Sequence, residues 1–427
     1  MLTIFGNFIM KKSVLAVAIA AAAFAASAAS AAQVYDKDGT TLAIGGQVEF
    51  MAGNAGNSYF KNDDATSRDR ARLTMAGRTQ LTNGIFAYAY NEWQADHNGD
   101  ISADDTTLKA RQQFLCVDFG NFGKVQMGRY KDPFVFASAV VDVLDEVGIY
   151  GGNDERNSGH LSYMWKGFGF DAGVSYQFAV DGYSTDTLGL ANTGIEALNT
   201  YYKSQNFIDD LAASGITGIT SAKIDKLGRF NVESGFSVYA GYTSVPVVFG
   251  PISIRAAYQY LKGQGNSETD TPSAVIDNLK TYDVSLAWGT NGKGFYVATN
   301  YNYSKASLDE TYITVTTATA SDKDELDAIK TKAWETVATY GFENGIRLGA
   351  SYHWINVDLD DVDGDRKFVQ LIADYNVTPN FKVWAETLFD AGSDDGLARL
   401  GGVTVDADNR VDVLEHNSFM VGARYVF

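Results

Sequence analysis

Apolar and polar residues alternate along most of the chain from position 42 onward. In 168–178, Phe or aliphatic residues and Tyr occupy every second position, and Gly, Asp, Ser and Gln stand between them. The segments 295–304 and 346–354 repeat the pattern. Because successive side chains of a strand point to opposite faces, this period predicts β-strands with one apolar and one polar face. At roughly 9–12 residues, such strands are long enough to cross a membrane when tilted.

The connections between these strands alternate in length. Seven predicted short turns lie at 82–84, 120–121, 166–167, 245–250, 289–293, 343–345 and 377–380. Eight long connections lie at 53–67, 95–106, 131–157, 179–228, 263–278, 305–330, 358–365 and 391–415. Short turns at one end and long loops at the other are typical of outer-membrane barrels. We therefore expect an all-β fold, a transmembrane antiparallel β-barrel of 16 strands, closed by pairing of the C-terminal strand with 42–51.

The two faces of the predicted strands favour a barrel with a wet interior. One face carries Gln, Asn, Asp, Arg and Ser in strand after strand, and a dry core could not satisfy so many polar groups. The other face carries aromatic residues near strand ends, which we interpret as an interfacial girdle, although strands favour aromatic residues in any case. These residues are Tyr88, Tyr90, Tyr176, Phe178, Trp288, Tyr301, Tyr303, Tyr340 and Phe342.

The N-terminus has the features of a secretory signal peptide. Lys11 and Lys12 precede an Ala-rich stretch, 14–26, and small residues continue to Ala32. A basic start, a short apolar centre and small residues before the cleavage point define such signals. We expect a signal peptide over residues 1–32, with cleavage after Ala32, and a barrel domain over 33–427.

Composition narrows the chemistry. The net charge is −18, which argues against nucleic acid as a partner and favours attraction of cations through the long-range field. Cys116 is the single cysteine, so no disulfide framework exists. No Cys/His cluster has metal-ligand spacing, and the acidic stretch 358–365 matches a calcium loop only loosely. We expect no cofactor.

The connection 131–157 differs from an ordinary surface loop. Its part 133–144 is mostly apolar or small, and acids follow in its second half. A surface loop should be polar, so an apolar loop of this length needs a surface to pack against. We expect it to fold into the barrel and act as a constriction loop.

Several short motifs, in order along nearly the whole chain after residue 32, resemble the general diffusion porins of Gram-negative bacteria. The matching segments are 33–39 with 42–46, Ala71-Arg-Leu73 with Gly77 and Thr79-Gln80, Gly128-Arg129 followed by 142–148, and the terminal Phe427. The resemblance implies a trimeric outer-membrane channel whose third loop is infolded. It also implies that the barrel-assembly machinery reads Phe427.

The resemblance further implies an array of acids facing bases across the pore. The matching acids are Asp142 and Glu146, and the matching bases are Arg72, Arg129 and Arg156. Three further residues extend the predicted array: Asp145 on the loop, Arg70 on the same strand face as Arg72, and Arg111, which shares a face with Lys109. Strict alternation from Val125 and Met127 points Arg129 outward, so only the resemblance supports its assignment. Gln47 stands where the family usually has a lysine, and Asp145 where it has a proline. Because this chain has one base fewer and one acid more than the usual family pattern, we expect its constriction to be more negative than is usual in the family.

The leading hypothesis is therefore a passive channel of the Gram-negative outer membrane for ions and small hydrophilic solutes. We expect a homotrimer surrounded by lipopolysaccharide and outer-membrane lipid. A sugar-selective channel is an alternative, with Trp384 and Phe136 as the candidate stacking residues. An outer-membrane hydrolase built on His160 with Ser158 or Ser162 is a weaker one, because no oxyanion motif is visible.

Overall fold

A computed structural model gives the fold of the chain. The structure describes residues 31–54, 66–97, 108–145, 156–183, 195–196, 199–215, 219–224, 230–264, 275–309, 312–317, 321–325, 327–359, 362–392, 403–405, 411–413 and 417–427. Residues 1–30 of the predicted signal peptide lie outside the described residues. Glu146 also lies outside them.

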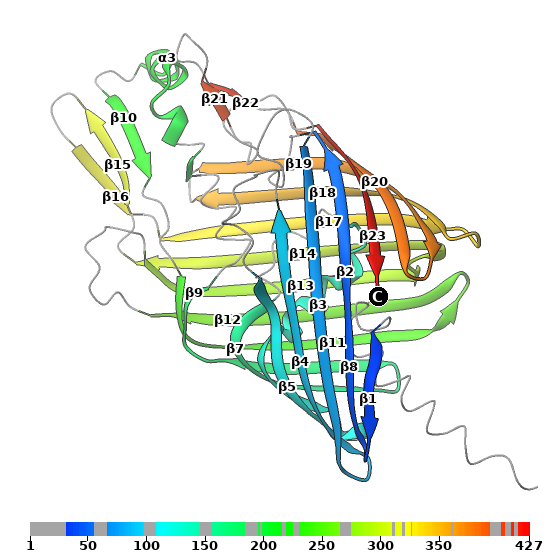
Figure 1. Ribbon diagram of the computed structural model, residues 1–427. Helices are drawn as coiled ribbons and strands as arrows, with labels where there is room; N and C mark the ends of the chain where they lie inside the picture. The colour runs from blue at the N-terminus through cyan, green and yellow to red at the C-terminus, as the bar shows by residue number, and fades with distance from the viewer. Residues whose placement is uncertain are drawn as a thin grey trace, which may run out of the picture.

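The main sheet has 18 strands, of which β1 (Ala32–Lys37) and β9 (Val180–Tyr183) are short additions. The other sixteen form a closed antiparallel ring, which confirms the predicted barrel (Figure 1). They are β2 (Thr40–Gly53), β3 (Thr66–Thr82), β4 (Ile85–His97), β5 (Lys109–Asp118), β6 (Lys124–Lys131), β7 (Arg156–Gly167), β8 (Phe170–Gln177), β11 (Phe230–Val247), β12 (Gly250–Gly263), β13 (Val275–Thr290), β14 (Lys293–Asp309), β17 (Ala328–Gly341), β18 (Ile346–Leu359), β19 (Val362–Thr378), β20 (Phe381–Asp390) and β23 (Ser418–Val426).

The ring closes where the chain ends. β23 pairs with the second half of β2, from Gln47 opposite Val426 to Gly53 opposite Met420. β1, which the alternation did not predict, pairs with the first half of β2 through a turn at Asp38 and Gly39. Both turn residues have positive φ, as a two-residue hairpin turn requires. β1 and β23 thus share one edge of β2 and leave no long unpaired edge.

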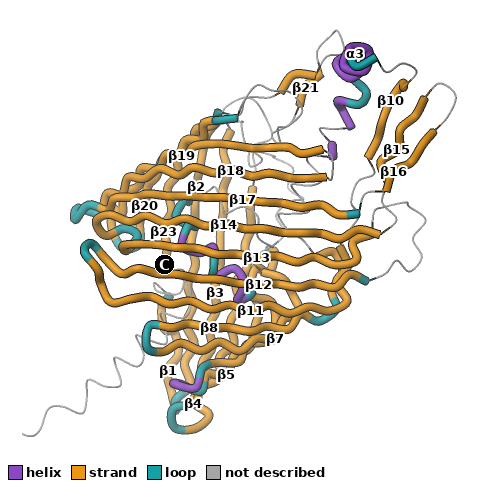
Figure 2. Tube along the Cα trace, turned by 180° about the vertical axis from the view of Figure 1, so that it is seen from behind, coloured by secondary structure: helices purple, strands orange, loops and turns teal. Residues whose placement is uncertain are grey.

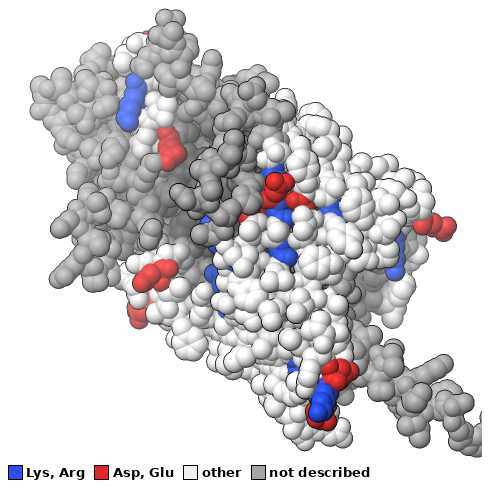
Figure 3. Space-filling model, in the orientation of Figure 1, with Lys and Arg blue, Asp and Glu red and all other residues white. Residues whose placement is uncertain are grey.

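Exposure alternates along the strands as an inside-out barrel requires. In β2, Val48 and Phe50 are 56% and 50% exposed, whereas Gln47 and Glu49 between them are 5% and 1% exposed. Apolar side chains therefore face outward and polar ones inward. On the face seen in Figure 3, charged side chains gather in a few separate groups and much of the wall carries none.

The predicted short turns all join neighbouring strands, but two predictions at strand ends are wrong. Residues 358–365 are not a long loop, because β18 and β19 extend until Leu359 pairs with Val362. The Asp and Gly residues there indicated a loop, yet these strands continue past the expected span. Phe168 is not on the strand face either: it lies in the β7–β8 turn with φ 56° and is 94% exposed.

The long connections carry secondary structure of their own at one end of the barrel (Figure 1). β10 (Ile219–Ile224), β15 (Tyr312–Thr317) and β16 (Ser321–Glu325) form a small sheet, and β21 (Val403–Val405) pairs with β22 (Val411–Val413). The connection 179–228 contains the helix α3 (Gln205–Ala213), which Ser204 caps. Within the described ranges, no helix is long and apolar enough to cross a membrane.

Figures 1 and 2, seen from opposite sides, place the wall of β2–β5 across the barrel from the wall of β12–β19. The inward face is less uniformly polar than predicted. An apolar cluster includes inward side chains of several strands together with Ile195 from a long connection; among its members are Met51, Leu261, Ile329, Phe368 and Trp384. Tyr88 and Tyr90, which we expected in the outer girdle, are 5% and 2% exposed. Tyr90 stacks on Phe114, which contacts Tyr130.

Candidate functional site: the charged wall of the barrel

The segment after β6 is held by a buried carboxylate. Asp132 is 1% exposed and caps η3 (Pro133–Phe136) by accepting from the Phe134 backbone N–H at 2.7 Å. The Ser175 and Ser237 hydroxyls also donate to this carboxylate, at 2.8 and 2.5 Å. His160 Nε2 lies 3.6 Å from it. His160, Ser175 and Ser237 thus fix the start of the segment to β7, β8 and β11.

Side chains of three further strands hold the backbone carbonyls that follow. Arg255 of β12 donates to the Phe136 carbonyl at 3.0 Å, and Ser285 of β13 donates to that of Ala137 at 2.6 Å. The Tyr296 hydroxyl of β14 donates to the carbonyl of Val140, at the end of η4 (Ser138–Val140), at 2.6 Å. Each strand supplies one donor in turn, so the segment runs across the polar faces of β12–β14.

Asp145 ends the described part of this segment among cations. Its carboxylate accepts from Lys382 of β20 at 2.5 Å and from Arg424 of β23 at 3.0 Å, and Arg347 of β18 lies 4.0 Å away. Its backbone N–H donates to Glu386 at 2.5 Å. The Asp145 side chain is only 5% exposed, and these partners offset the cost of burying a carboxylate.

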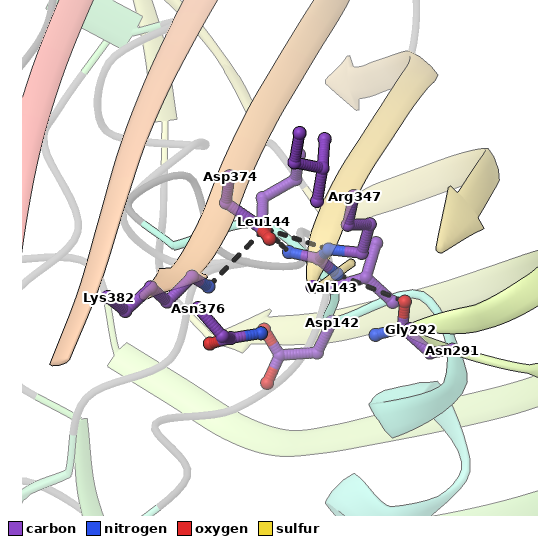
Figure 4. A pocket seen from close by; sticks show the side chains of 11 residues that line it. Asp142, Val143, Leu144, Asn291, Gly292, Arg347, Asp374, Asn376 and Lys382 are labelled. Atoms are coloured by element: carbon purple, nitrogen blue, oxygen red, sulfur yellow. Dashed lines mark hydrogen bonds and ion pairs between the residues drawn. The ribbon is translucent and has the colours of Figure 1, made fainter. Parts of the chain in front are cut away.

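A cavity of about 310 Å³ lies beside this contact (Figure 4). Arg347 reaches Asp374 of β19 with both Nε and Nη2, and Lys382 Nζ lies 3.4 Å from the same carboxylate. Asp142 and Asn376 also line the cavity. The cavity therefore brings together carboxylates and cations with an amide, a polar setting suited to water and ions rather than to an apolar ligand.

A second group of charges covers β3–β5. Arg72 Nε donates to Gln94 at 2.6 Å, and Arg111 donates to Glu92 at 2.7 Å and to Gln94 at 2.8 Å. Arg70 Nη1 lies 3.2 Å from Glu49 Oε1, and Arg68 and Arg70 lie 3.2 and 3.4 Å from Asp96. Arg156 interacts electrostatically with Glu92 and Arg111. Four of the five arginines predicted as pore bases thus lie together.

Glu49 of β2 links the two groups. It is 1% exposed and contacts both Arg70 of β3 and Arg424 of β23. A chain of ion pairs therefore runs from Asp145 through Arg424, Glu49 and Arg70 to Asp96. It crosses the seam where the barrel closes.

Arg129 does not join this group. Its guanidinium donates to Ser158, an exposed residue, and it stands opposite Gln113, which is also exposed. Tyr130, beside it, is 2% exposed and faces inward. Strict alternation therefore describes Arg129 better than the resemblance did. Gln47 does face inward, 5% exposed and paired in register with Arg72.

Several residues of the wall were not predicted. They are Glu49, Glu92, Arg347, Asp374, Lys382, Glu386 and Arg424. Alternation could have put each on the inward face, as it does for Lys382, Trp384 and Glu386 of β20. Alternation could not have shown that the wall residues of β18, β19, β20 and β23 lie at the same height in the barrel as Asp145.

The described acids show no metal site. Within the described ranges, no cluster of three or more His, Cys, Asp or Glu side chains could hold an ion. Asp365 lies 3.0 Å from Lys367 and Asp358 lies 3.7 Å from Lys330, so these acids of 358–365 already face cations.

Comparison with known proteins agrees with this geometry. A family model described as Gram-negative porin matches residues 16–395. The chain belongs to the Gram-negative porin family. It is 26% identical over 396 residues to outer membrane porin C of Rahnella aquatilis, covering 88% of this chain and 98% of that protein. It is 24% identical over 426 residues to OmpD of Salmonella typhimurium, covering 98% and 100%.

Solved structures agree on the fold. OmpF of Salmonella typhi, in complex with daunomycin, superposes with a TM-score of 0.63 at 17% identity, over 93% of this chain and 100% of that chain. OmpT of Vibrio cholerae gives 0.58 at 15% identity, over 92% and 100%. The family and the fold together make this porin a channel-forming barrel of the Gram-negative outer membrane.

Proposed function

We propose that this porin passes ions and small hydrophilic solutes by passive diffusion, with cations favoured. The observation that carries the proposal is the charged wall: cations and carboxylates from β2–β5, β18–β20 and β23 face the inside of the ring. Such a wall hydrates and orients dipolar solutes and penalises apolar ones. Most wall cations already have an acidic partner, so the chain's net charge of −18 sets the sign of the field.

We further propose that residues 131–157 form the constriction loop, with Asp142, Asp145 and Glu146 as its acids. Support comes from the described half, whose carbonyls and Asp145 are held by side chains of six strands, β12, β13, β14, β18, β20 and β23. A surface loop would not need inward-facing donors on so many strands.

Solute flux into liposomes tests the proposed function. Vesicles containing this porin should swell in isotonic solutions of small sugars and amino acids, at rates that fall steeply with solute size and do not saturate. Saturation for one solute would favour the selective-channel alternative. No observation favours that alternative: Trp384 is 3% exposed beneath Arg424, and Phe136 packs edge-on against Tyr239.

Nor does any observation favour the hydrolase. Ser158 is exposed on the outer side of β7, whereas His160 is 1% exposed and lies beside Asp132. Ser158 and His160 therefore point to opposite faces. Ser162 shares the inward face with His160 but is only 3% exposed, so a substrate could not reach it. Replacing His160 by Ala should leave the channel open.

We propose that three copies assemble through the wall of β4–β7. This wall carries an outward polar patch of Asn91, Gln113, Arg129 and Ser158. Gln113 donates to Asn91 at 3.4 Å, and Arg129 donates to Ser158 at 3.5 Å. An Arg facing lipid at mid-membrane depth costs about 2–4 kcal/mol, so another copy is a better neighbour for this patch than lipid.

Replacing Arg129 by Leu tests whether lipid or a second copy of the chain covers this patch. If a second copy covers the patch, R129L should lower the temperature at which trimers dissociate on gels, because the partner's polar groups lose a donor. Lys367→Leu, which removes an outward cation from the wall of β19, should leave that temperature nearly unchanged. A more stable trimer in R129L would mean that the residue faces lipid.

The remaining partners follow from location. We propose that the barrel-assembly machinery reads Phe427, whose ring extends the outward apolar face of β23 and stacks on Tyr425 at 6.5 Å. We also propose contact with lipopolysaccharide in the outer leaflet. Nucleic acid has no place in this function.

A further inference from the structure

The inner face of the barrel carries an apolar row near the strand ends that lead into the long connections. Leu261 of β12 pairs in register with Leu279 of β13, which pairs with Ala306 of β14. Ala306 pairs in turn with Ile329 of β17. Each of the four lies within four residues of the strand end at the long connections. We call these four residues the apolar row.

The apolar row is covered although it faces the inside of the ring. Its four side chains are 1% exposed or less. Polar side chains line the inside of a water-filled barrel, so apolar side chains at its mouth need a cover. The apolar cluster that contains the row includes one described residue from outside the strands, Ile195 of the connection 179–228, which is 0% exposed. Tyr202 of the same connection packs against this cluster.

Tyr202 belongs to a segment that has a small core of its own. The ring centroid of Phe207, on α3, lies 5.2 Å from that of Tyr202 and 5.5 Å from that of Tyr201. Ser204 caps α3 and donates to the Tyr201 carbonyl at 2.7 Å. The Tyr201 hydroxyl also donates to Asp210 of α3. These contacts fix the turn before α3, and Figures 1 and 2 show α3 beyond the strand ends of the barrel.

We propose that the described residues 195–196 and 199–213 form a lid, which narrows the mouth of the barrel and limits the size of solutes that reach the charged wall. Ile195 and Tyr202 dock the lid on inward side chains of the strands, so the lid occupies part of the cross-section of the ring. Leu144, beside Asp145 in the segment after β6, packs against the same cluster. The inference rests on the proposed diffusion function and adds a size limit that is separate from the charge of the wall.

Replacing Ile195 by Asp should undock the lid, because an unpaired carboxylate is costly to bury among apolar side chains. The double variant, Ile195→Asp with Tyr202→Asp, removes both docking residues. Ile208→Asp is the matched control, since Ile208 is 45% exposed on α3. Trypsin cleavage after Lys203, an exposed residue beside Tyr202, reports undocking of the lid. Cleavage should be faster in the single and double variants and unchanged in the control.

Liposome swelling in a monosaccharide and in a trisaccharide measures the size limit. In the single and double variants, we expect the ratio of the trisaccharide rate to the monosaccharide rate to be at least double that of the parent. The Ile208→Asp control should keep the parent ratio. The change in gel mobility on heating shows that the barrel of each protein is folded.

Three results would contradict this account. The parent ratio in the double variant, together with faster cleavage after Lys203, would overturn the lid, because the segment would then move without changing the size limit. The parent ratio with unchanged cleavage would overturn it too, because Ile195 and Tyr202 would then not hold the segment. In both cases, entry of the monosaccharide at the parent rate would leave the diffusion function intact. Failure of the monosaccharide to enter vesicles with the parent protein would contradict the proposed function and the lid with it.

Discussion

Replacing Asp145 by Lys is expected to shift ion selectivity strongly toward anions and to raise the conductance. The parent carboxylate contacts Lys382 and Arg424, and Arg347 lies 4.0 Å away. The variant replaces one negative by one positive charge at this point. A unit charge about 4 Å from a passing ion changes the energy of that ion by roughly 1 kcal/mol in water. The change of two charge units in the variant therefore alters the cation-to-anion permeability ratio by about tenfold or more.

Conductance should rise for a second reason. A lysine at 145 is repelled by the cations that hold the parent side chain, and truncating one partner of a buried ion pair destabilises by about 3–5 kcal/mol. The segment would then leave this contact, while Asp132 and the carbonyl bonds of 136–140 hold its other end.

Reversal potentials in a salt gradient measure the first effect, and single-channel steps measure the second. Glu343→Lys is the matched control, since it makes the same charge change at an exposed residue of the β17–β18 turn. It should alter selectivity little. Unchanged selectivity in D145K would mean that ions do not pass near Asp145.

Replacing Leu286 by Arg should destabilise the barrel in membranes by about 2–4 kcal/mol, the range for an arginine on the lipid face near mid-depth. Leu286 is 49% exposed, on the outward face of β13. Tyr282 lies toward the loop end of the same outward face. Toward the turns lies Trp288, which stacks on Phe249 at 4.0 Å. These aromatic residues bracket Leu286 within the apolar band.

Urea titration of folding in lipid vesicles gives the free energy of unfolding for this comparison. Val248→Arg is the control: Val248 is 89% exposed, but in the β11–β12 turn, where the charge stays in water. It should change stability by less than about 0.5 kcal/mol. Equal losses in both variants would contradict the placement of the membrane around the strands.

The sequence predicted the barrel well because strand alternation is a local property. Residues 170–177 alternate in exposure as they alternate in polarity, and the short turns join the strands that they should. The prediction failed where one local pattern is compatible with two structures. The Asp and Gly residues at 358–365 predicted a loop, although they extend two strands. Tyr88 and Tyr90 were predicted to belong to the outer girdle, although they face inward.

The wall could be predicted only in part, because ion pairs depend on register between distant strands. Arg70, Arg72 and Arg111 lie on neighbouring strands, and the sequence placed them in one patch. Glu49 and Arg424 are 375 positions apart and meet only because β2 pairs with β23. Asp145 was predicted to face the arginines of β3–β5, and its described partners instead belong to β18, β20 and β23.

The most direct test of the channel is the conductance of the purified parent protein in a planar lipid bilayer under a salt gradient. We expect stepwise openings that group in threes, a conductance that rises with salt concentration, and a reversal potential on the cation-favouring side. A membrane that stays insulating after insertion of correctly folded protein would contradict the existence of a continuous water-filled path along the charged wall.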